Sequence, residues 1–219
     1  MPSNPEQISW EKYYSETSVI SFEENSFQYS YLALLLSDQV PSIIDPREPK
    51  NFLLGGFYPY NKTPEAFQEC SRTIHKNPRD RLIYLDFNPQ PLQALPASIK
   101  MRSTLLNLPF QSSIDFMFLD YTTDFMSDEQ VAAFSTSAAT ALRRNGVSLI
   151  ALRNTEVLRQ QARQMPYIPA YPRTQDELVG LLRDMKFLGS MEGHEGDVLA
   201  FAPPSSDFKS AAFSIPAIG

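Results

Sequence analysis

The sequence predicts an α/β fold: a doubly wound, mostly parallel seven-stranded sheet with a C-terminal antiparallel hairpin, preceded by an N-terminal helical extension. Three observations predict it. Short apolar runs alternate with helix-like segments from Asn51 onwards, a pattern typical of parallel strands joined by helical crossovers. The last two apolar runs are joined by a short turn and therefore indicate a hairpin. A chain of 219 residues is also long enough to bury a substantial core.

The first 50 residues are expected to form the extension and a linker. This segment is rich in aromatic residues, and its apolar positions recur at helical spacing, which predicts an amphipathic helix ending near Asp38. The residues with this spacing are Phe27, Tyr31, Leu34 and Leu35. Three prolines between positions 41 and 49 then break the helical pattern. We expect the α/β domain to occupy residues 51–203 and a tail to occupy residues 204–219.

Seven strands are expected within the domain, and they come in the order 52–57, 81–87, 101–106, 114–121, 147–153, 187–191 and 197–202. Thr63 and Pro64 are typical of a helix start, and that helix should reach His75. A short helical or turn-rich stretch is expected at 91–98. Ser127 should begin a helix that ends at Arg144 before Asn145 and Gly146. Thr174 begins a capping-box pattern that opens a helix to about residue 185.

Composition excludes several classes of protein. A net charge of −6 and an isoelectric point near 5.0, without any basic run, argue against a nucleic-acid-binding protein. The longest apolar runs are far shorter than a membrane helix, and the N-terminus lacks the pattern of a signal peptide. Cys70 is the single cysteine, and His75 and His194 are the two histidines, so neither a disulfide nor a metal centre is expected. We expect a cytoplasmic protein that binds no membrane.

The candidate ligand site follows from the expected topology. Doubly wound sheets bind ligands beyond the carboxyl ends of their strands, where the strand order reverses beside the first strand. The loops that follow Phe57, Phe87, Leu106 and Tyr121 are therefore expected to build the site.

Several residues in this order resemble the class I S-adenosylmethionine (SAM) methyltransferases, which have a Rossmann-like fold. The resemblance covers roughly residues 51–203. It rests on an acidic residue at the end of the second strand, a passage that resembles "LPF…FD" before the fourth, an acidic-aromatic pair after the fourth, a turn before the fifth, and a closing helix and hairpin. These features are Asp86, Leu108-Pro109-Phe110 with Ile114-Asp115, Asp120-Tyr121, Arg143–Gly146, and the segment from Asp176 to Phe187.

The resemblance implies SAM as cofactor and assigns residues to it. Asp86, followed by Phe87, stands where the family binds the ribose hydroxyls, and a carboxylate can accept from two vicinal hydroxyls at once; a solvated strand-end acid or a helix cap is the alternative. The first loop is represented by Gly55 and Gly56, for which a tight strand-to-helix turn without ligand is the alternative, and the backbone N–H of Leu105 stands where the adenine is met. Asp120 is expected in the cofactor pocket and Tyr121 in the substrate pocket; capping of the Ser127 helix is the structural alternative for Asp120.

The first loop departs from the family pattern. Leu53 replaces the usual acidic residue, and Phe57 and Pro59 stand where later glycines are expected. Glycine there allows positive φ and a close approach of the cofactor. Thr104 likewise stands where an aspartate often precedes the "LPF" passage. A bulky loop could bind SAM in another geometry or could fill the pocket.

Aromatic, histidine and cysteine residues outside these motifs have their own interpretations. Tyr13 and Tyr14, with Trp10, could cover a flat substrate or surround a sulfonium by cation–π contact; alternatively, the N-terminal helix packs on the sheet or on another subunit. His75 is expected to complement a helix dipole. Cys70 is expected in the core. His194 is expected in the hairpin turn, remote from the site.

The sequence therefore predicts a SAM-dependent methyltransferase acting on an unidentified small molecule. The alternative is a catalytically inactive methyltransferase-like module that binds a protein partner. The residues that would act in catalysis stay unassigned, because aligned methyl transfer needs no triad and a general base is optional. A nicotinamide-dependent oxidoreductase is disfavoured because the G-x-G-x-x-G pattern is absent. A homo-oligomer is left open.

Overall fold

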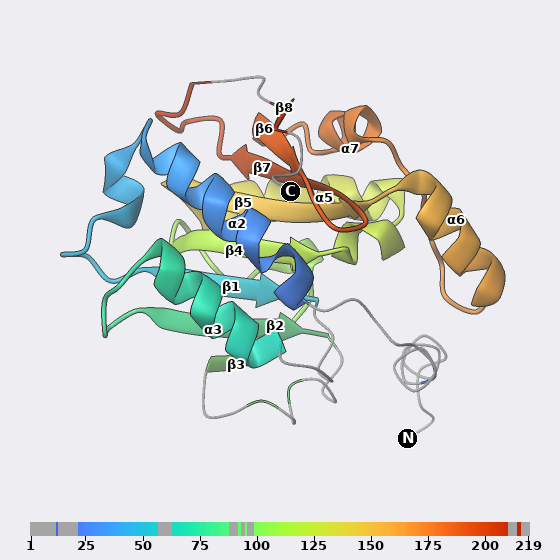
Figure 1. The fold of residues 1–219 in the computed structure, drawn as a ribbon, viewed down its shortest axis with the longest axis horizontal. Helices are drawn as coiled ribbons and strands as arrows, with labels where there is room; N and C mark the ends of the chain where they lie inside the picture. Colours follow the sequence, from blue (N-terminus) through green and yellow to red (C-terminus); the bar gives the residue numbers. More distant parts are fainter. Residues whose placement is uncertain are drawn as a thin grey trace.

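A mixed sheet organises the chain (Figure 1). The computed structural model describes residues 12, 22–56, 63–87, 92, 95, 99–209 and 214–215. Among these residues the strands lie in the order β3-β2-β1-β4-β5-β7-β6-β8. The strands are β1 (Asn51–Gly55), β2 (Arg81–Asp86), β3 (Ile99–Arg102), β4 (Ile114–Asp120), β5 (Leu142–Arg153), β6 (Lys186–Glu192), β7 (Gly196–Ala202) and β8 (Ser214–Ile215). Strands β1 to β5 are parallel, and β7 runs antiparallel to both β5 and β6. The predicted fold class is confirmed, and the two-residue β8 adds to the predicted seven strands.

Helices cover both faces of this sheet, as the doubly wound prediction requires. In Figure 1, α2 and α3 lie in front of the sheet and α6 lies beyond its right-hand edge, toward which the parallel arrows point. The α-helices are α2 (Phe22–Ser37), α3 (Thr63–Ile74), α5 (Asp128–Ala141), α6 (Thr155–Gln164) and α7 (Gln175–Leu181). Short 3₁₀ turns are η1 (Pro41–Ile44), η2 (Leu105–Asn107) and η3 (Thr122–Phe125).

Two cores result, one on each face of the sheet. Successive residues of β1 point to opposite faces: Phe52 and Leu54 belong to the core beneath α2 and α3, whereas Leu53 belongs to the core beneath α5 and α7. Both faces of β1 and β4 are therefore apolar and buried, which explains why their sequences are nearly continuous apolar runs.

The helix α2 packs on the sheet through a face that helical spacing did not identify. Its buried apolar side chains are Phe22, Tyr29, Leu32, Ala33 and Leu36. Of the predicted stripe, Phe27 and Leu34 are exposed, whereas Tyr31 stacks on Phe27 and packs at the margin of the core. The helix is thus apolar on both sides, so spacing alone could not assign its core face.

Several element boundaries differ from the predictions. The helix α5 ends at Ala141 and β5 follows at once, although the sequence suggested a helix through Arg144. The pairing of β4 with β5 is irregular near its start, and a methyl group on Gly146 would lie 2.6 Å from the carbonyl oxygen of Ile114. Gly146 therefore serves close strand packing, not a helix stop. The strand β3 lies slightly earlier than predicted, and α6, capped by Asn154, was not predicted.

The predicted cap at Ser127 and the predicted capping box at Thr174 are both confirmed. The Ser127 and Thr174 side chains each accept from the backbone three residues later, at Gln130 and Glu177, and both boxes are complete. No helix in the described part of the chain is both long enough and apolar enough to cross a membrane.

Candidate functional site

The carboxyl ends of the parallel strands meet at one edge of the sheet, where the sequence placed the site. Gly55, Asp86 and Asp120 end β1, β2 and β4, and these strands are adjacent, with β1 between the other two. The strand order reverses between β1 and β4, because the chain leaves β1 toward β2 on one side and returns on the other.

The turn after β1 is tight and is held by the chain itself. Gly56 has a φ of +61°, in the left-handed region, and its N–H donates to the carbonyl oxygen of Leu85 at 3.0 Å. The Thr122 hydroxyl donates to the carbonyl oxygen of Gly56 at 2.8 Å. A methyl group added to Gly56 would lie 2.4 Å from Thr122 Cγ2, and one added to Gly55 would lie 2.7 Å from Leu105 Cδ2. Side chains of the protein thus fill the space over both glycines.

Asp86 ends β2 beside this turn. Its side chain is buried, and its backbone carbonyl oxygen accepts from the N–H of Ser103. Phe87, the next residue, is 45% exposed. A carboxylate can accept hydrogen bonds from both hydroxyls of a ribose, so Asp86 suits an adenosyl cofactor at the end of β2. The residues at the glycine turn suit it poorly, because Leu105 and Thr122 already occupy the approach to the backbone.

Asp120 is bound by α2. Asn25 Nδ2 and the Tyr29 hydroxyl both donate to Asp120 Oδ1, each at 3.0 Å. Burial raises the pKa of Asp120 to about 6, although both hydrogen bonds act to lower it. Asn25 Oδ1 also accepts from the N–H of His194 in the turn between β6 and β7, at 3.4 Å. Asp120, which was predicted to line the cofactor pocket, therefore holds α2 on β4, and Asn25 extends this connection to the hairpin.

A second buried cluster lies at the ends of β4 and β5, and of its members the sequence had identified Tyr121 alone. Arg153 Nε donates to Glu195 at 3.2 Å, and Arg153 Nη1 lies 3.6 Å from Asp124 Oδ2. The guanidinium also lies 4.2 Å from the centre of the Tyr121 ring. Tyr121 has a φ of +55°, which is strained for an aromatic residue. A charged residue that ends an apolar strand was the available signal for Arg153.

Asp124 is fully buried, and both the guanidinium and the backbone N–H of Arg153 favour its charged form. Burial raises the pKa of Asp124 to about 7, and the charge of Arg153 opposes that rise. The Thr123 hydroxyl has no hydrogen-bond partner among the described residues.

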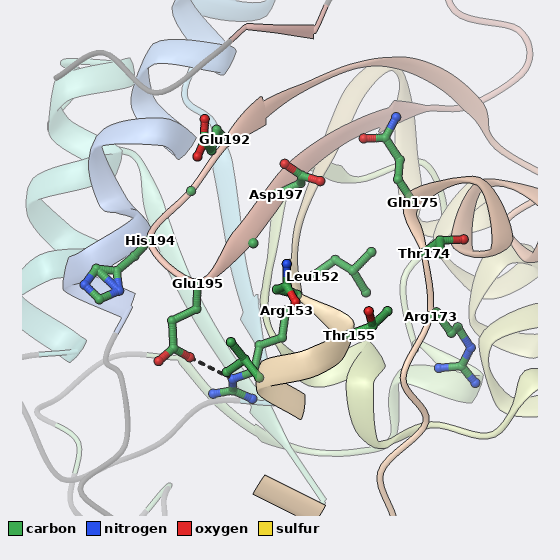
Figure 2. Close-up of a pocket in the computed structure, with 14 residues that line it drawn as sticks. Leu152, Arg153, Thr155, Arg173, Thr174, Gln175, Glu192, His194, Glu195 and Asp197 are labelled. Carbon is green, nitrogen blue, oxygen red and sulfur yellow. Dashed lines mark hydrogen bonds and ion pairs between the residues drawn. The ribbon is translucent and has the colours of Figure 1, made fainter. Parts of the chain in front are cut away.

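A groove of about 700 Å³ opens beside this cluster (Figure 2). We call it the hairpin groove. Its lining residues are Leu152–Thr155 and Val157 from the end of β5 and the start of α6, Arg173–Gln175 before and at the start of α7, and Glu192–Asp197 from the hairpin. His194 was expected to be remote from the strand ends, and this was wrong. Because β7 pairs antiparallel with β5, the hairpin turn lies at the carboxyl edge, and His194 lines the groove.

The other candidates can now be placed. Tyr13, Tyr14 and Trp10, together with Phe57 and Pro59, lie outside the described residues. Cys70 is buried and accepts from the Ser30 hydroxyl, and burial raises the pKa of its thiol to about 12, as expected of a core residue. The described residues contain no group of three or more His, Cys, Asp or Glu side chains suited to a metal ion.

Comparison by sequence finds no matching protein-family model and no matching curated protein. Comparison of structures finds many matches. The N-methyltransferase NodS from Bradyrhizobium japonicum WM9, in complex with S-adenosyl-L-homocysteine (SAH), aligns with a TM-score of 0.60 and 13% identity over 92% of this chain and 100% of NodS. The PH0226 protein from Pyrococcus horikoshii OT3 aligns with a TM-score of 0.61 and 8% identity over 88% of this chain and 98% of PH0226. LepI in complex with SAM aligns with a TM-score of 0.59 and 16% identity over 77% of this chain and 46% of LepI.

The chain spans about half the length of the pyocyanin biosynthetic protein PhzM, of which it covers 55%, at a TM-score of 0.52 and 15% identity. At these identities the similarity concerns the fold alone. The alignment with NodS extends over nearly all of this chain and all of NodS. The chain therefore has the fold of the class I SAM-dependent methyltransferases.

Proposed function

We propose that the protein is a SAM-dependent methyltransferase that acts on a small molecule. One observation carries the proposal: Asp86 ends β2 beside the Gly55–Gly56 turn, at the point where this fold binds its ligand. Structural neighbours in complex with SAM and SAH support it.

In this proposal Asp86 accepts hydrogen bonds from the two ribose hydroxyls, and the exposed ring of Phe87 lies next to it. SAM, when bound, supplies a methyl carbon that its sulfonium has already activated. The protein then needs chiefly to hold the acceptor in line and to limit access of water. Asp120 contributes by fixing Asn25 and Tyr29, so that the start of α2 covers the end of β4.

Calorimetric titration with SAM and SAH tests the proposal. The unmodified protein should bind both, Asp86→Asn should weaken binding at least tenfold, and Asp86→Glu should retain part of it. Asp207→Asn is the control, since Asp207 is a half-exposed surface carboxylate bonded to Arg144 and Asn145. Circular dichroism without ligand verifies that each variant is folded. Absence of binding at millimolar ligand would refute the proposal.

A second candidate function is a methyltransferase-fold module that binds a partner and no cofactor. Leu105 and Thr122 favour it, because their side chains fill the approach to Gly55 and Gly56. Under this alternative, neither SAM nor SAH raises the melting temperature, since only a ligand that binds the folded state stabilises it.

A further inference from the structure

Asn145 and Gly146 form a chemically labile pair. Asparagine is among the residues that degrade on heating. In that reaction the backbone nitrogen of the following residue attacks the side-chain amide carbon, and glycine hinders the attack least because it has no side chain. The chain contains a single Asn-Gly pair. The sequence suggested a helix stop there, but the pair lies near the start of β5, so the strand decides whether it reacts.

The backbone of this pair is held in the sheet. Gly146 is buried, and a methyl group added to it would lie 2.6 Å from the carbonyl oxygen of Ile114. Val147, the next residue, is paired with Phe116 of β4. In a strand each side chain stands out from the line of the backbone. The Gly146 nitrogen must therefore leave its packed position before it can reach Cγ of Asn145.

The side-chain amide of Asn145 is held at both of its polar atoms by one residue. Its Nδ2 donates to Asp207 Oδ2 at 2.9 Å, and its Oδ1 accepts from the backbone N–H of Asp207 at 3.0 Å. The hydrogen bond from Asn145 and the charge of Arg144 lower the pKa of Asp207, so its carboxylate is charged. The amide can therefore turn toward the Gly146 nitrogen only by breaking both hydrogen bonds.

Asp207 belongs to the segment 203–209, which follows β7 and which we call the C-terminal strap. Arg144, beside Asn145, binds the strap as well. Its Nε donates to the carbonyl oxygen of Ser205 at 3.1 Å, and its Nη2 donates to Asp207 Oδ1 at 2.5 Å. Two neighbouring residues at the start of β5 therefore hold the strap.

The strap in turn packs against the end of α2. Phe208 is buried in the core beneath α2, and its carbonyl oxygen accepts from Lys186 Nζ at the start of β6. The N–H of Lys209 donates at 3.1 Å to the side chain of Gln39, just beyond α2. Figure 1 shows the chain leaving β7 close to this end of the helix. Release of the strap would therefore expose Phe208 and loosen the end of α2.

We propose that Asn145–Gly146 is a deamidation site that Asp207 keeps closed, and that its reaction releases the C-terminal strap. In the reaction the Gly146 nitrogen forms a bond to Asn145 Cγ and the Cγ–Nδ2 bond breaks. The proton of the Gly146 N–H passes through water to Nδ2, which leaves as ammonia. A water molecule then opens the cyclic imide and leaves aspartate or isoaspartate at position 145.

The product reverses the contact with Asp207. An aspartate at position 145 has no side-chain N–H to donate, and its carboxylate faces the like charge of Asp207. Isoaspartate also carries the main chain through the former side chain, which lengthens β5 and disturbs its pairing with β4. At the start of β5, Arg144 alone is then left to hold the strap.

Peptide mass spectrometry of the full chain, incubated at mildly alkaline pH, measures the deamidation rate at Asn145. The folded parent protein should react at least tenfold more slowly than the same chain in urea. Asp207→Ala should react at least threefold faster than the parent while remaining folded by circular dichroism. Asp207→Asn, whose amide oxygen can still accept from Nδ2, should stay within twofold of the parent. Equal rates in the folded and denatured chain, or in Asp207→Ala and the parent, would overturn the inference.

Hydrogen exchange of Asn145→Asp, which reproduces one product, tests release of the strap. The amides of Asp207 and Lys209 should exchange at least tenfold faster than in the parent protein. Asn107→Asp is the matched control, because it adds the same charge at an exposed position in η2, and it should leave this exchange unchanged. Unchanged exchange in Asn145→Asp, or equal acceleration in both variants, would overturn the release. Neither measurement requires SAM, so this inference and the proposed function can fail separately.

Discussion

Gly56→Ala should destabilise the protein by about 2–5 kcal/mol. Two terms make up this range. Alanine in the left-handed conformation that Gly56 adopts, at φ +61°, costs about 1–2 kcal/mol. The added methyl group would lie 2.4 Å from Thr122 Cγ2, and relieving such an overlap in a packed region costs about 1–3 kcal/mol more. Urea denaturation followed by circular dichroism measures the sum.

A double-mutant cycle separates the two terms. Thr122→Ser removes Cγ2 but keeps the hydroxyl that donates to the carbonyl oxygen of Gly56. In the Thr122→Ser background, Gly56→Ala should therefore cost about 1 kcal/mol less. Gly180→Ala is the control: Gly180 is exposed in α7 with nothing near its added methyl group, and the substitution should stabilise by up to about 1 kcal/mol. A cost for Gly56→Ala that is the same with Thr or Ser at position 122 would refute the reasoning.

Three further predictions concern buried charges. Burial raises the pKa of Asp120 to about 6 and that of Asp124 to about 7, from an ordinary value of 3.8. The folded state therefore binds protons more tightly than the unfolded state, and the free energy of unfolding should fall as pH rises from 4 to 7. In urea titrations at several pH values, Asp124→Asn should make this dependence on pH less steep. His75 is buried and contacts the Asp80 carboxylate through Nδ1 at 2.8 Å and the carbonyl oxygen of Asp45 through Nε2 at 2.9 Å. Asp80→Ala should cost about 2 kcal/mol in the same assay, because it leaves Nδ1 of the ring without its partner, and no cost would contradict that role. Arg173→Lys should lower the melting temperature of the protein. The planar guanidinium of Arg173 connects Asp128 to the carbonyl oxygens of Thr123 and Met126, and lysine lacks this set of donors. An unchanged melting temperature would argue against that role.

The fold could be predicted from the sequence because its strands are buried on both faces. Segments such as Phe52–Leu54 and Phe116–Leu119 are unbroken apolar runs, and the capping boxes at Ser127 and Thr174 mark helix starts chemically. The convergence of Asp86, Asp120 and the Gly55–Gly56 turn also follows from topology, because parallel strands end at the same edge.

The contacts at that edge could not be predicted in the same way. Asp120 binds Asn25 and Tyr29 because α2 turns its Tyr29 face to the sheet, and the helix is apolar on both sides, so spacing gave no preference. The filling of the glycine turn by Thr122 and Leu105 depends on distances between loops. Both effects require the packed structure.

The hairpin groove was missed for a different reason. Its charges come from positions far apart in the chain, and only the register of β5, β7 and β6 brings them together. That register places Glu192 opposite Asp197 and Gly196 opposite Arg153. The sequence indicated a hairpin but did not show that its turn lies at the carboxyl edge of the parallel strands. For that reason His194 was expected to lie away from the site.

The central claim is that the carboxyl edge over β1 and β2 binds an adenosyl cofactor, and amide chemical shifts measured by NMR during titration with SAH test it most directly. The account predicts that the amide signals of Gly56, Asp86 and Phe87 move with one saturable dependence on ligand concentration, whereas that of Gly180, on the exposed side of α7, stays fixed. Unchanged signals at millimolar SAH, or changes confined to residues away from β1 and β2, would contradict it.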